Sequence, residues 1–278
     1  MSEIKPILKP FLRWVGGKQR IVKYLLPFVP RKYNNYHEPF LGSGALFFAI
    51  YPKKAYLADR NDQLINCYRF IRDEPVNVYR HLIEHVSKTS EEYYYNVRRE
   101  FNENGNESVE QAGRFIYLNR TNFNGIYRVN LQGKYNVPYG KKEPPPIPLI
   151  EDLIKASAML KHAELNNYTF QNSMKQDLNR DDFFYLDPPY PPITRLDSSF
   201  NHYTNKRFSW ELQRELAITA TSLIDDCYIM ISNSDIPEIR ELYKSCDKKW
   251  IFHTLSVRRF VSANGKRKNV DELIITNY

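Results

Sequence analysis

A carboxylate, two prolines and a tyrosine directly follow an apolar, strand-like run of four residues. They are Asp187, Pro188, Pro189 and Tyr190, and the run is 183–186. Two prolines in a row cannot extend a central strand, so the chain leaves the sheet rigidly with carbonyl oxygens that no following helix uses. The carboxylate and such a carbonyl can accept both hydrogens of an exocyclic amine, and the ring offers a stacking surface. The motif favours chemistry on the amino group of a nucleobase, although a plain turn uses the same residue types.

A second motif, Glu38-Pro39-Phe40 followed by glycines at 42 and 44, precedes an apolar run and then a strand-like stretch ending at Asp59. Strand, glycine turn, helix, strand and acidic tip open a nucleotide-binding unit, in which Gly42 lets a cofactor approach the backbone and the Asp59 carboxylate can accept both ribose hydroxyls. A lone Gly-x-Gly is more often a plain turn. The third glycine of the dinucleotide fingerprint is absent here, which suits a cofactor without phosphate.

A third motif near the start of the chain places Trp14 before the pair Gly16–Gly17 and Lys18. The tryptophan can be a core anchor and the glycines an ordinary loop. The lysine can equally hold the carboxylate of an amino-acid-like cofactor.

Elements that could position these motifs alternate between helical and extended patterns. An α/β sheet begins before residue 60 and resumes after about residue 165, and a helical and β-hairpin insertion separates the two parts. Four prolines in 143–148 mark the end of the insertion. We expect helices at 62–86 with a break at Pro75, 91–99, 109–118 and 150–160, a hairpin of 127–129 with 135–137, and strands at 182–186, 227–231, 251–257 and 272–276.

The charge of the chain is +8, and its distribution is more informative than its total. Two tracts, 112–142 with six basic residues and 248–268 with seven, contain no acidic residue. Such tracts are typical of phosphate-facing surfaces. The three cysteines stand singly and no metal-ligand spacing occurs, so we expect reduced packing thiols and no metal. No apolar run suits a signal peptide or a membrane span, and we expect a cytoplasmic protein.

The motifs occur in the order found in the Dam-type DNA adenine-N6 methyltransferases, which the chain resembles over nearly its whole length. The matching segments are FLRWVGGK (11–18), EPFLGSGALF (38–47) with Asp59, YLNRTNFNGIYRVNLQGKYNVPYG (117–140), FFYLDPPYPP (183–192) and NGKRKNVDELIITNY (264–278). The resemblance implies a Rossmann-like α/β methyltransferase sheet with helices on both faces, in a catalytic domain of 1–61 and 162–278. It implies a target-recognition domain at 62–161, inserted between cofactor and catalytic motifs.

The same resemblance implies the reaction and the residues that perform it. The methyl donor is S-adenosylmethionine, the product is S-adenosylhomocysteine, and the acceptor is N6 of an adenine flipped out of double-stranded DNA, with 5′-GATC as the expected site. Asp187, Pro188, Pro189 and Tyr190 would be catalytic. Contacts with the cofactor would come from Trp14, Gly17, Lys18, Glu38, Pro39, Phe40, Gly42, Asp59 and Asp187. Contacts with DNA would come from Arg13, Arg120, Asn122, Phe123, Asn124, Ile126, Arg128, Asn130, Pro138 and Lys141.

Phe123 would wedge into the duplex and Asn124 would meet the unpaired base. Arg13 stands where a relative has lysine, and either side chain can donate to guanine, which leaves the geometry of that contact open.

Several alternatives remain at this point. Cytosine-N4 transfer also activates an exocyclic amine, although serine usually replaces the aspartate there. Cytosine-C5 transfer is disfavoured because no cysteine follows a proline. An RNA methyltransferase or an inactive sequence-specific DNA-binding protein is compatible with the charge. We expect a monomer, in a bacterial, archaeal or phage-infected cell, with a cognate restriction endonuclease as a further partner.

Overall fold

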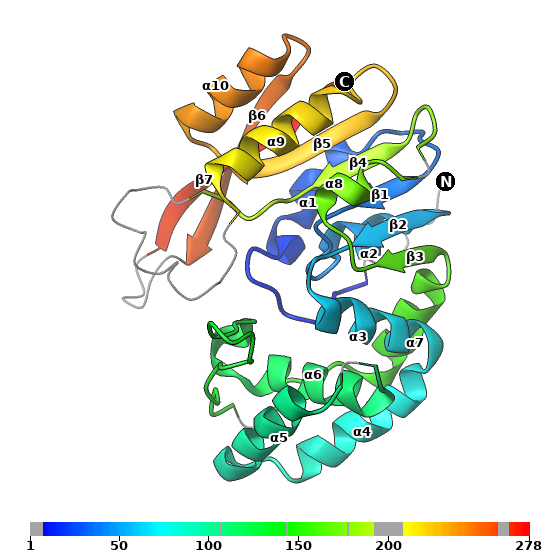
Figure 1. The fold of residues 1–278 in the computed structure, drawn as a ribbon, viewed down its shortest axis with the longest axis vertical. Helices are drawn as coiled ribbons and strands as arrows, with labels where there is room; N and C mark the ends of the chain where they lie inside the picture. Colours follow the sequence, from blue (N-terminus) through cyan, green and yellow to red (C-terminus); the bar gives the residue numbers. More distant parts are fainter. Residues whose placement is uncertain (1–7, 106, 143, 177, 192–207, 261–266) are drawn as a thin grey trace.

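The computed structural model describes residues 8–105, 107–142, 144–176, 178–191, 208–260 and 267–278, and side chains at 257–270 lie outside this description. A sheet with its covering helices forms the upper half of the molecule in Figure 1. Helices of the insertion form the lower half, with α3 and α7 between the two parts. The expected α/β arrangement with a helical insertion is therefore confirmed, while the domain boundaries at 61 and 162 stay a prediction.

The described residues form one seven-stranded sheet in the order β3-β2-β1-β4-β5-β7-β6. The first five strands of that order are parallel, and β7 runs antiparallel to both of its neighbours. The bounds are β1 (Tyr36–Glu38), β2 (Ala55–Ala58), β3 (Ala163–Asn166), β4 (Phe183–Leu186), β5 (Tyr228–Ser234), β6 (Ile251–Phe260) and β7 (Arg267–Thr276). The four predicted strands of the second half are confirmed, and β3 was not predicted.

Alternation along the strands divides the core between the two faces of the sheet. Phe183 and Tyr185 of β4 join one buried cluster with α1, α2 and α3, whereas Phe184 and Leu186 join a second cluster with α8, α9 and α10. Successive strand residues point to opposite faces, so a strand that is apolar throughout needs helices on both sides. The helices next to the sheet are α1 (Val22–Leu25), α2 (Ala45–Ile50), α3 (Asp62–Asp73), α8 (Phe170–Ser173), α9 (Trp210–Thr221) and α10 (Pro237–Cys246).

Two helices of the insertion, α5 and α6, begin at side-chain caps. Ser90 accepts from the backbone N–H of Tyr93, and Ser108 accepts from that of Gln111. Such caps satisfy backbone donors that the first helical turn leaves unpaired. Pro75 starts a new helix, as its fixed φ allows at a first helical position. The helices are α4 (Pro75–Ser87), α5 (Glu91–Glu103), α6 (Val109–Thr121) and α7 (Ile150–Leu160), which confirms the expected positions.

The predicted hairpin is present, but as isolated bridges in place of regular strands. Val129 pairs with Tyr135 and Asn122 with Tyr139, and Gly133 makes the turn at φ +76°. The outer side of one arm is bonded by a side chain of α5: Asn102 donates to the carbonyl of Tyr135 at 3.0 Å and accepts from its N–H at 2.7 Å. Since a side chain takes these backbone groups, no third strand can extend the ladder.

One buried cluster continues from the sheet into the insertion. It includes Tyr36 and Phe183 in the sheet, Phe101 and Phe115 in α5 and α6, and Tyr135 in the hairpin. Burial of this shared apolar surface holds the insertion against the sheet.

A buried carboxylate joins the amino ends of β1 and β4. Asp182 accepts from the backbone and side-chain nitrogens of Asn35 at 2.9 and 3.0 Å and from the N–H of Asn179 at 3.0 Å. His37 Nε2 lies 2.8 Å from its other oxygen, and the imidazole stacks between Tyr56 and Phe184. Burial raises the pKa of Asp182, but hydrogen bonds from His37, Asn35 and Asn179 outweigh burial and hold that pKa below its ordinary value.

We expect Asp182→Ala to lower the free energy of unfolding by about 3 kcal/mol, because it leaves buried donors without an acceptor. A carboxyl with a depressed folded-state pKa contributes stability above its unfolded pKa of about 3.9, and that contribution is lost as pH falls through the folded-state value. The difference from the wild type should therefore shrink at strongly acidic pH. Denaturant unfolding at several pH values measures it, with Asp226→Ala, an exposed carboxylate nearby, as the control. Equal losses in the two variants would contradict this role.

Candidate active site

The glycine turn and the proline motif meet at the point where the strand order reverses. β1 and β4 are adjacent and parallel, and their following segments begin at Pro39 and Asp187. A crevice forms at the carboxyl ends of such a pair because the two connections leave toward opposite faces. Here a cleft of about 1980 Å³ opens, and it is lined by the ends of β1, β2 and β4, the first turn of α9 and the hairpin that follows α6. The topology brings the three predicted chemical motifs into one site.

An ion pair connects the motif near the start of the chain with the proline motif after β4. Lys18 Nζ lies 2.6 Å from Asp187 Oδ1 and donates to the carbonyl of Gly16 at 2.9 Å. The lysine side chain is 4% exposed and that of the aspartate 17%. Burial raises the pKa of Asp187, and the ammonium of Lys18 opposes that rise. The Asp187 carboxyl therefore lies beside a cation at the wall of the cleft.

The residues after Asp187 are fixed by two contacts from other elements. The carbonyl of Pro189 accepts from Gln213 Nε2 of α9 at 3.0 Å, and Asn233 of β5 donates to Gln213 Oε1 at 3.3 Å. The hydroxyl of Tyr190 donates to Glu272 of β7. The ammonium of Lys18 lies 4.7 Å from the centre of the Tyr190 ring. A carboxylate, carbonyl groups and an aromatic face therefore share one rigid loop, which is the arrangement predicted from the sequence.

Asp59 at the end of β2 fixes the glycine turn. Its oxygens accept from the backbone N–H of Gly42 at 3.0 Å and of Asn61 at 2.9 Å. Burial raises the pKa of Asp59, and these hydrogen bonds oppose the rise. Each carboxylate oxygen has a second lone pair, so the group can still accept hydroxyl donors from the cleft.

Gly42 is required by its backbone and by its neighbour. Its φ is +47°, and a Cβ there would lie 2.7 Å from Cδ1 of Trp14. Trp14 in turn stacks on Tyr127 of the hairpin, with ring centres 5.4 Å apart, and on Phe115 of α6 at 6.4 Å. This tryptophan is both a packing anchor and part of the cleft wall.

Glu38 lies at the floor of the cleft, 2% exposed. The hydroxyl of Tyr36 donates to its Oε2 at 2.8 Å. Burial raises the pKa of Glu38 well above its ordinary value, and the hydrogen bond from Tyr36 only partly opposes the rise. Gly17 and Pro39 line the cleft on either side of this floor.

Phe40 forms an aromatic wall with two residues that the sequence did not indicate. Its ring stacks on Phe170 of α8 with centres 5.6 Å apart and meets Phe208 edge to face at 5.6 Å. All three line the cleft, which gives it a flat apolar side beside Asp59. Phe170, Phe208 and Gln213 stand in segments with no motif, so only their place in the fold identifies them. Glu272 lies in the matching segment 264–278, but the sequence predicted no role for it.

The hairpin brings five of the predicted DNA contacts to the rim. Phe123 is 53% exposed and Asn124 adopts φ +59°, and both face the cleft. Ile126, Arg128 and Pro138 line it as well. Arg128 is braced by its own hairpin, since Nε donates to Asn136 Oδ1 at 2.8 Å.

Three other predicted DNA contacts are bonded within the protein. The guanidinium of Arg120 donates to the carbonyl of Phe11 at 2.9 and 2.6 Å, and burial lowers its pKa to about 10. Asn122 is buried and donates to the carbonyl of Ile126 and the hydroxyl of Tyr135. The Asn130 carboxamide accepts from backbone groups of its own turn. These three side chains shape the hairpin and its support.

Arg13 and Lys141 are not among the residues that line the cleft. The backbone N–H and carbonyl of Arg13 are both bonded to the Asn119 carboxamide, at 2.9 and 2.8 Å, and its side chain crosses Gly125, where a Cβ would lie 2.5 Å from Cδ. Lys141 is exposed and lies 3.5 Å from Glu91. Lys248 and Lys249 of the second basic tract are exposed, and its remaining basic side chains lie outside the described ones.

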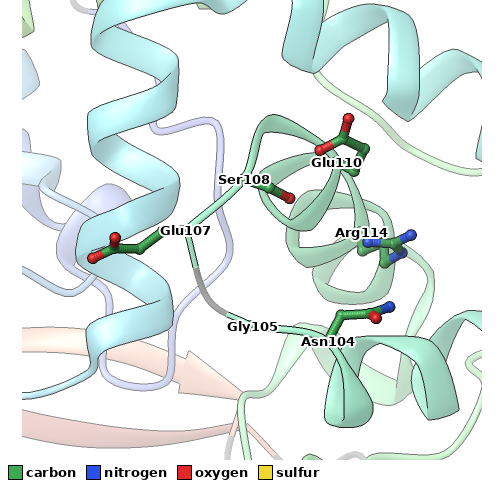
Figure 2. Close-up of a pocket in the computed structure, with 6 residues that line it drawn as sticks. All are labelled: Asn104, Gly105, Glu107, Ser108, Glu110 and Arg114. Carbon is green, nitrogen blue, oxygen red and sulfur yellow. The ribbon is translucent and has the colours of Figure 1, made fainter.

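A smaller hollow lies between the end of α5 and the start of α6, far from the motifs described above. Its lining residues, labelled in Figure 2, are Asn104, Gly105, Glu107, Ser108, Glu110 and Arg114, and the Glu107 side chain points away from Glu110 and Arg114. Arg114 is paired with Glu100 at 3.3 Å, so its charge is partly satisfied. Nothing in this hollow matches a predicted site residue.

The cysteines are free thiols, and two further features concern metal binding and membrane insertion. Burial raises the pKa of Cys227 to about 11, which makes it a poor nucleophile. Within the described ranges, no group of three or more His, Cys, Asp or Glu side chains could hold a metal ion. Also within these ranges, no helix has the length and apolar character needed to cross a bilayer.

Comparisons with known proteins show the family of the chain and several relatives. A family model described as D12 class N6 adenine-specific DNA methyltransferase matches residues 14–262. The chain is 37% identical to a protein of Lactococcus lactis subsp. cremoris named Type II methyltransferase M1.LlaDCHI, over 98% of this chain and 96% of the relative. It is 33% identical to Type II methyltransferase M.MjaIII of Methanocaldococcus jannaschii, over 98% and 99% of the two chains. It is 35% identical to the DNA adenine methylase of Escherichia coli, over 96% and 94%.

We expect Gly42→Ala to destabilise the protein by about 2 to 4 kcal/mol, because it adds strain at positive φ and pushes against the Trp14 ring. Gly133→Ala is the matched control: its φ is +76°, but an added Cβ would meet nothing within 4 Å. The control should lose only about 1 kcal/mol. Denaturant unfolding of both variants gives the comparison. Equal losses would show that contact with Trp14 does not constrain the turn.

Proposed function

The chain belongs to the D12 class N6 adenine-specific DNA methyltransferase family, and we propose that it transfers the methyl group of S-adenosylmethionine to an adenine flipped out of duplex DNA within 5′-GATC. The observation that carries the proposal is the shared cleft. Asp187 to Tyr190, the turn fixed by Asp59, and the recognition hairpin all line it. The cleft therefore combines acceptor groups for an amine with a turn that would bind a nucleoside and a hairpin that would face DNA.

The residues of the cleft fit S-adenosylmethionine in charge and shape. Asp59 retains acceptor capacity for two ribose hydroxyls, and Gly42 leaves room for close approach. The wall of Phe40 and Phe170 suits a flat base. The carboxyl groups of Asp187 and Glu38 at this end of the cleft offer oxygen atoms to a cationic donor. When bound, the cofactor supplies an activated methyl group on a sulfonium.

Lys18 has a different immediate partner from the one its sequence position suggested. Its N–H groups point to Gly16 and Asp187, and Glu272 lies 3.6 Å away. We propose that the ammonium orients the Asp187 carboxylate and, at the same wall, meets the amino-acid end of the cofactor. Trp14, Gly17, Glu38 and Pro39 would complete that wall.

The proline loop would hold the target adenine. The Asp187 carboxylate and the carbonyl of Pro188 accept the two N6 hydrogens, which localises the nitrogen lone pair toward the donor. The Tyr190 ring stacks on the base, and Pro189 fixes the turn. Because the methyl group is already activated, catalysis is mainly alignment, which supplies on the order of 7 to 11 kcal/mol. The excess proton on N6 then leaves toward Asp187 or solvent.

Base flipping costs a few kcal/mol, and the hairpin would help to offset it. Phe123, exposed at the rim, would wedge into the stack while Asn124 meets the base left unpaired. Arg13, Ile126, Arg128 and Pro138 would read base edges. Lys141 and the basic tracts would bind phosphates, so affinity should fall with salt.

Arg120, Asn122 and Asn130 would serve DNA binding mainly by holding this surface in place. Arg120 fixes the segment that carries Arg13, and Asn122 and Asn130 fix the hairpin. We further propose that the protein acts in the cytoplasm as a monomer, with a cognate restriction endonuclease as its cellular partner.

We expect Asp187→Ala to reduce methyl transfer on the order of 10³-fold, because the amine loses its charged acceptor. Duplex binding should change little, since the hairpin and basic surfaces are untouched. Transfer of tritiated methyl groups and gel-shift titration measure the two effects. Asp226→Ala, at an exposed position, is the control. Near-normal turnover of Asp187→Ala would contradict the assigned role.

The sequence preference is tested on duplexes with each base pair of 5′-GATC changed in turn. We expect each change to cost at least about tenfold in kcat/KM, because a lost direct contact costs about 1 to 3 kcal/mol. Nucleoside analysis of the product should show N6-methyladenine alone. Equal rates on GATC and scrambled duplexes would end the GATC proposal and leave adenine methylation intact.

A further inference from the structure

Glu272 is a fully buried carboxylate directly behind the proposed catalytic loop. It lies on β7, where its backbone pairs with Ser234 of β5 and Leu255 of β6. Its side chain is about 1% exposed and does not line the cleft. The residue therefore does not touch the substrates directly.

One oxygen of Glu272 meets two groups of the site. Oε1 accepts the hydroxyl proton of Tyr190, and Lys18 Nζ lies 3.6 Å from the same atom. Lys18 also lies over the Tyr190 ring, 4.7 Å from its centre. The tyrosine is thus held at its hydroxyl by Glu272 and at its face by the ammonium, which fixes the plane of the ring.

A buried carboxylate at this position lowers the stability of the fold unless its charge has another use. Burying a carboxylate costs several kcal/mol, and an apolar residue of similar volume usually serves stability as well or better. The next three residues of β7 are buried and apolar, and they stabilise the strand by packing: Leu273, Ile274 and Ile275. The charge at Glu272 is explained by its two partners, both of which belong to the cleft wall.

The other end of the loop is fixed independently. Gln213, itself fully buried, donates to the carbonyl of Pro189 at 3.0 Å and accepts from Asn233. Gln213 thus sets the carbonyl side of the loop, and Glu272 sets the aromatic side. The charge of Glu272 also adds to burial in raising the pKa of Asp187, which keeps that carboxylate basic.

We propose that Glu272 is a positioning residue for methyl transfer, acting through the Tyr190 hydroxyl to hold the ring against the flipped base and through Lys18 to hold Asp187. The inference rests on the proposed function of the cleft. A ring that rotates about its side-chain torsions would leave the target amine misaligned, and such misplacement costs up to about 10²-fold in rate.

Three variants isolate the contact between Glu272 and Tyr190. Glu272→Met removes both oxygens, Tyr190→Phe removes the hydroxyl and keeps the ring, and Glu272→Gln keeps an acceptor in place. Asp271→Asn is the matched control, since Asp271 is the preceding residue of β7 but is exposed and bonded to Ser256. kcat, KM for the duplex, cofactor affinity and thermal unfolding are measured for each variant and for Glu272→Met with Tyr190→Phe.

We expect Glu272→Met and Tyr190→Phe each to lower kcat about 10- to 100-fold, with KM for the duplex changed less than about threefold. The double variant should be no slower than Glu272→Met, because that change already removes the contact that Tyr190→Phe removes, together with the contact to Lys18. Glu272→Gln should recover most of the rate, and Asp271→Asn should match the wild type.

Wild-type kcat in Glu272→Met, multiplicative losses in the double variant, or a rate in Glu272→Gln as low as in Glu272→Met would each overturn the inference. If Glu272→Met does not fold, Tyr190→Phe decides alone, and full activity of that variant overturns it. A wild-type chain that methylates no duplex would overturn the proposed function and this inference together. If the wild type methylates DNA, the proposed function stands, and the variants then test the role of Glu272 alone.

Discussion

The ion pair of Lys18 and Asp187, 2.6 Å long and largely shielded from solvent, is the constraint on which the site depends. It joins residues 169 positions apart and ties the start of the chain to the loop after β4. A shielded pair of this kind is stabilising only while both charges remain, since removal of one leaves the other uncompensated. The glycine pair at 16–17 bends the chain so that the ammonium reaches the carboxylate, and Gly16 supplies a further acceptor. The geometry of the cleft therefore follows from keeping this pair together.

The same N-terminal segment connects the sheet with the recognition insertion. Asn119 and Arg120 of α6 bond the backbone of Arg13 and Phe11, and Trp14 stacks on both the hairpin and α6. Because Trp14 also lies against Gly42, the turn fixed by Asp59 and the hairpin both contact this one side chain. A continuous buried cluster supports this connection between the sheet and the insertion.

Local patterns were sufficient for most of the fold. Period-3.6 spacing and the break at Pro75 placed α3, α4 and α7, and apolar runs placed β4, β5 and β7. β3 was not predicted because it is four residues long and only half of its residues are buried, so its apolar pattern is short and weak. The hairpin was expected as two strands, but only isolated bridges form between its arms. Arg120 and Asn122 were grouped with the DNA contacts on their sequence position alone, whereas their partners inside the protein depend on how α6 packs.

By itself, the sequence determined the chemical groups and the rigid turns that carry them: the carboxylate before two prolines, the glycines at positive φ, the basic tracts without acids and the order of the motifs. These are local properties, fixed by backbone sterics and residue type. Only the tertiary structure decided which groups meet. Gln213 and Phe170 carry no motif, and Glu272 lies in a matching segment without a predicted role. All three meet residues of the cleft because the order of strands places β7, α9 and α8 beside the loops after β1 and β4. Proximity between residues distant in sequence depends on strand order and helix packing, which no single segment encodes.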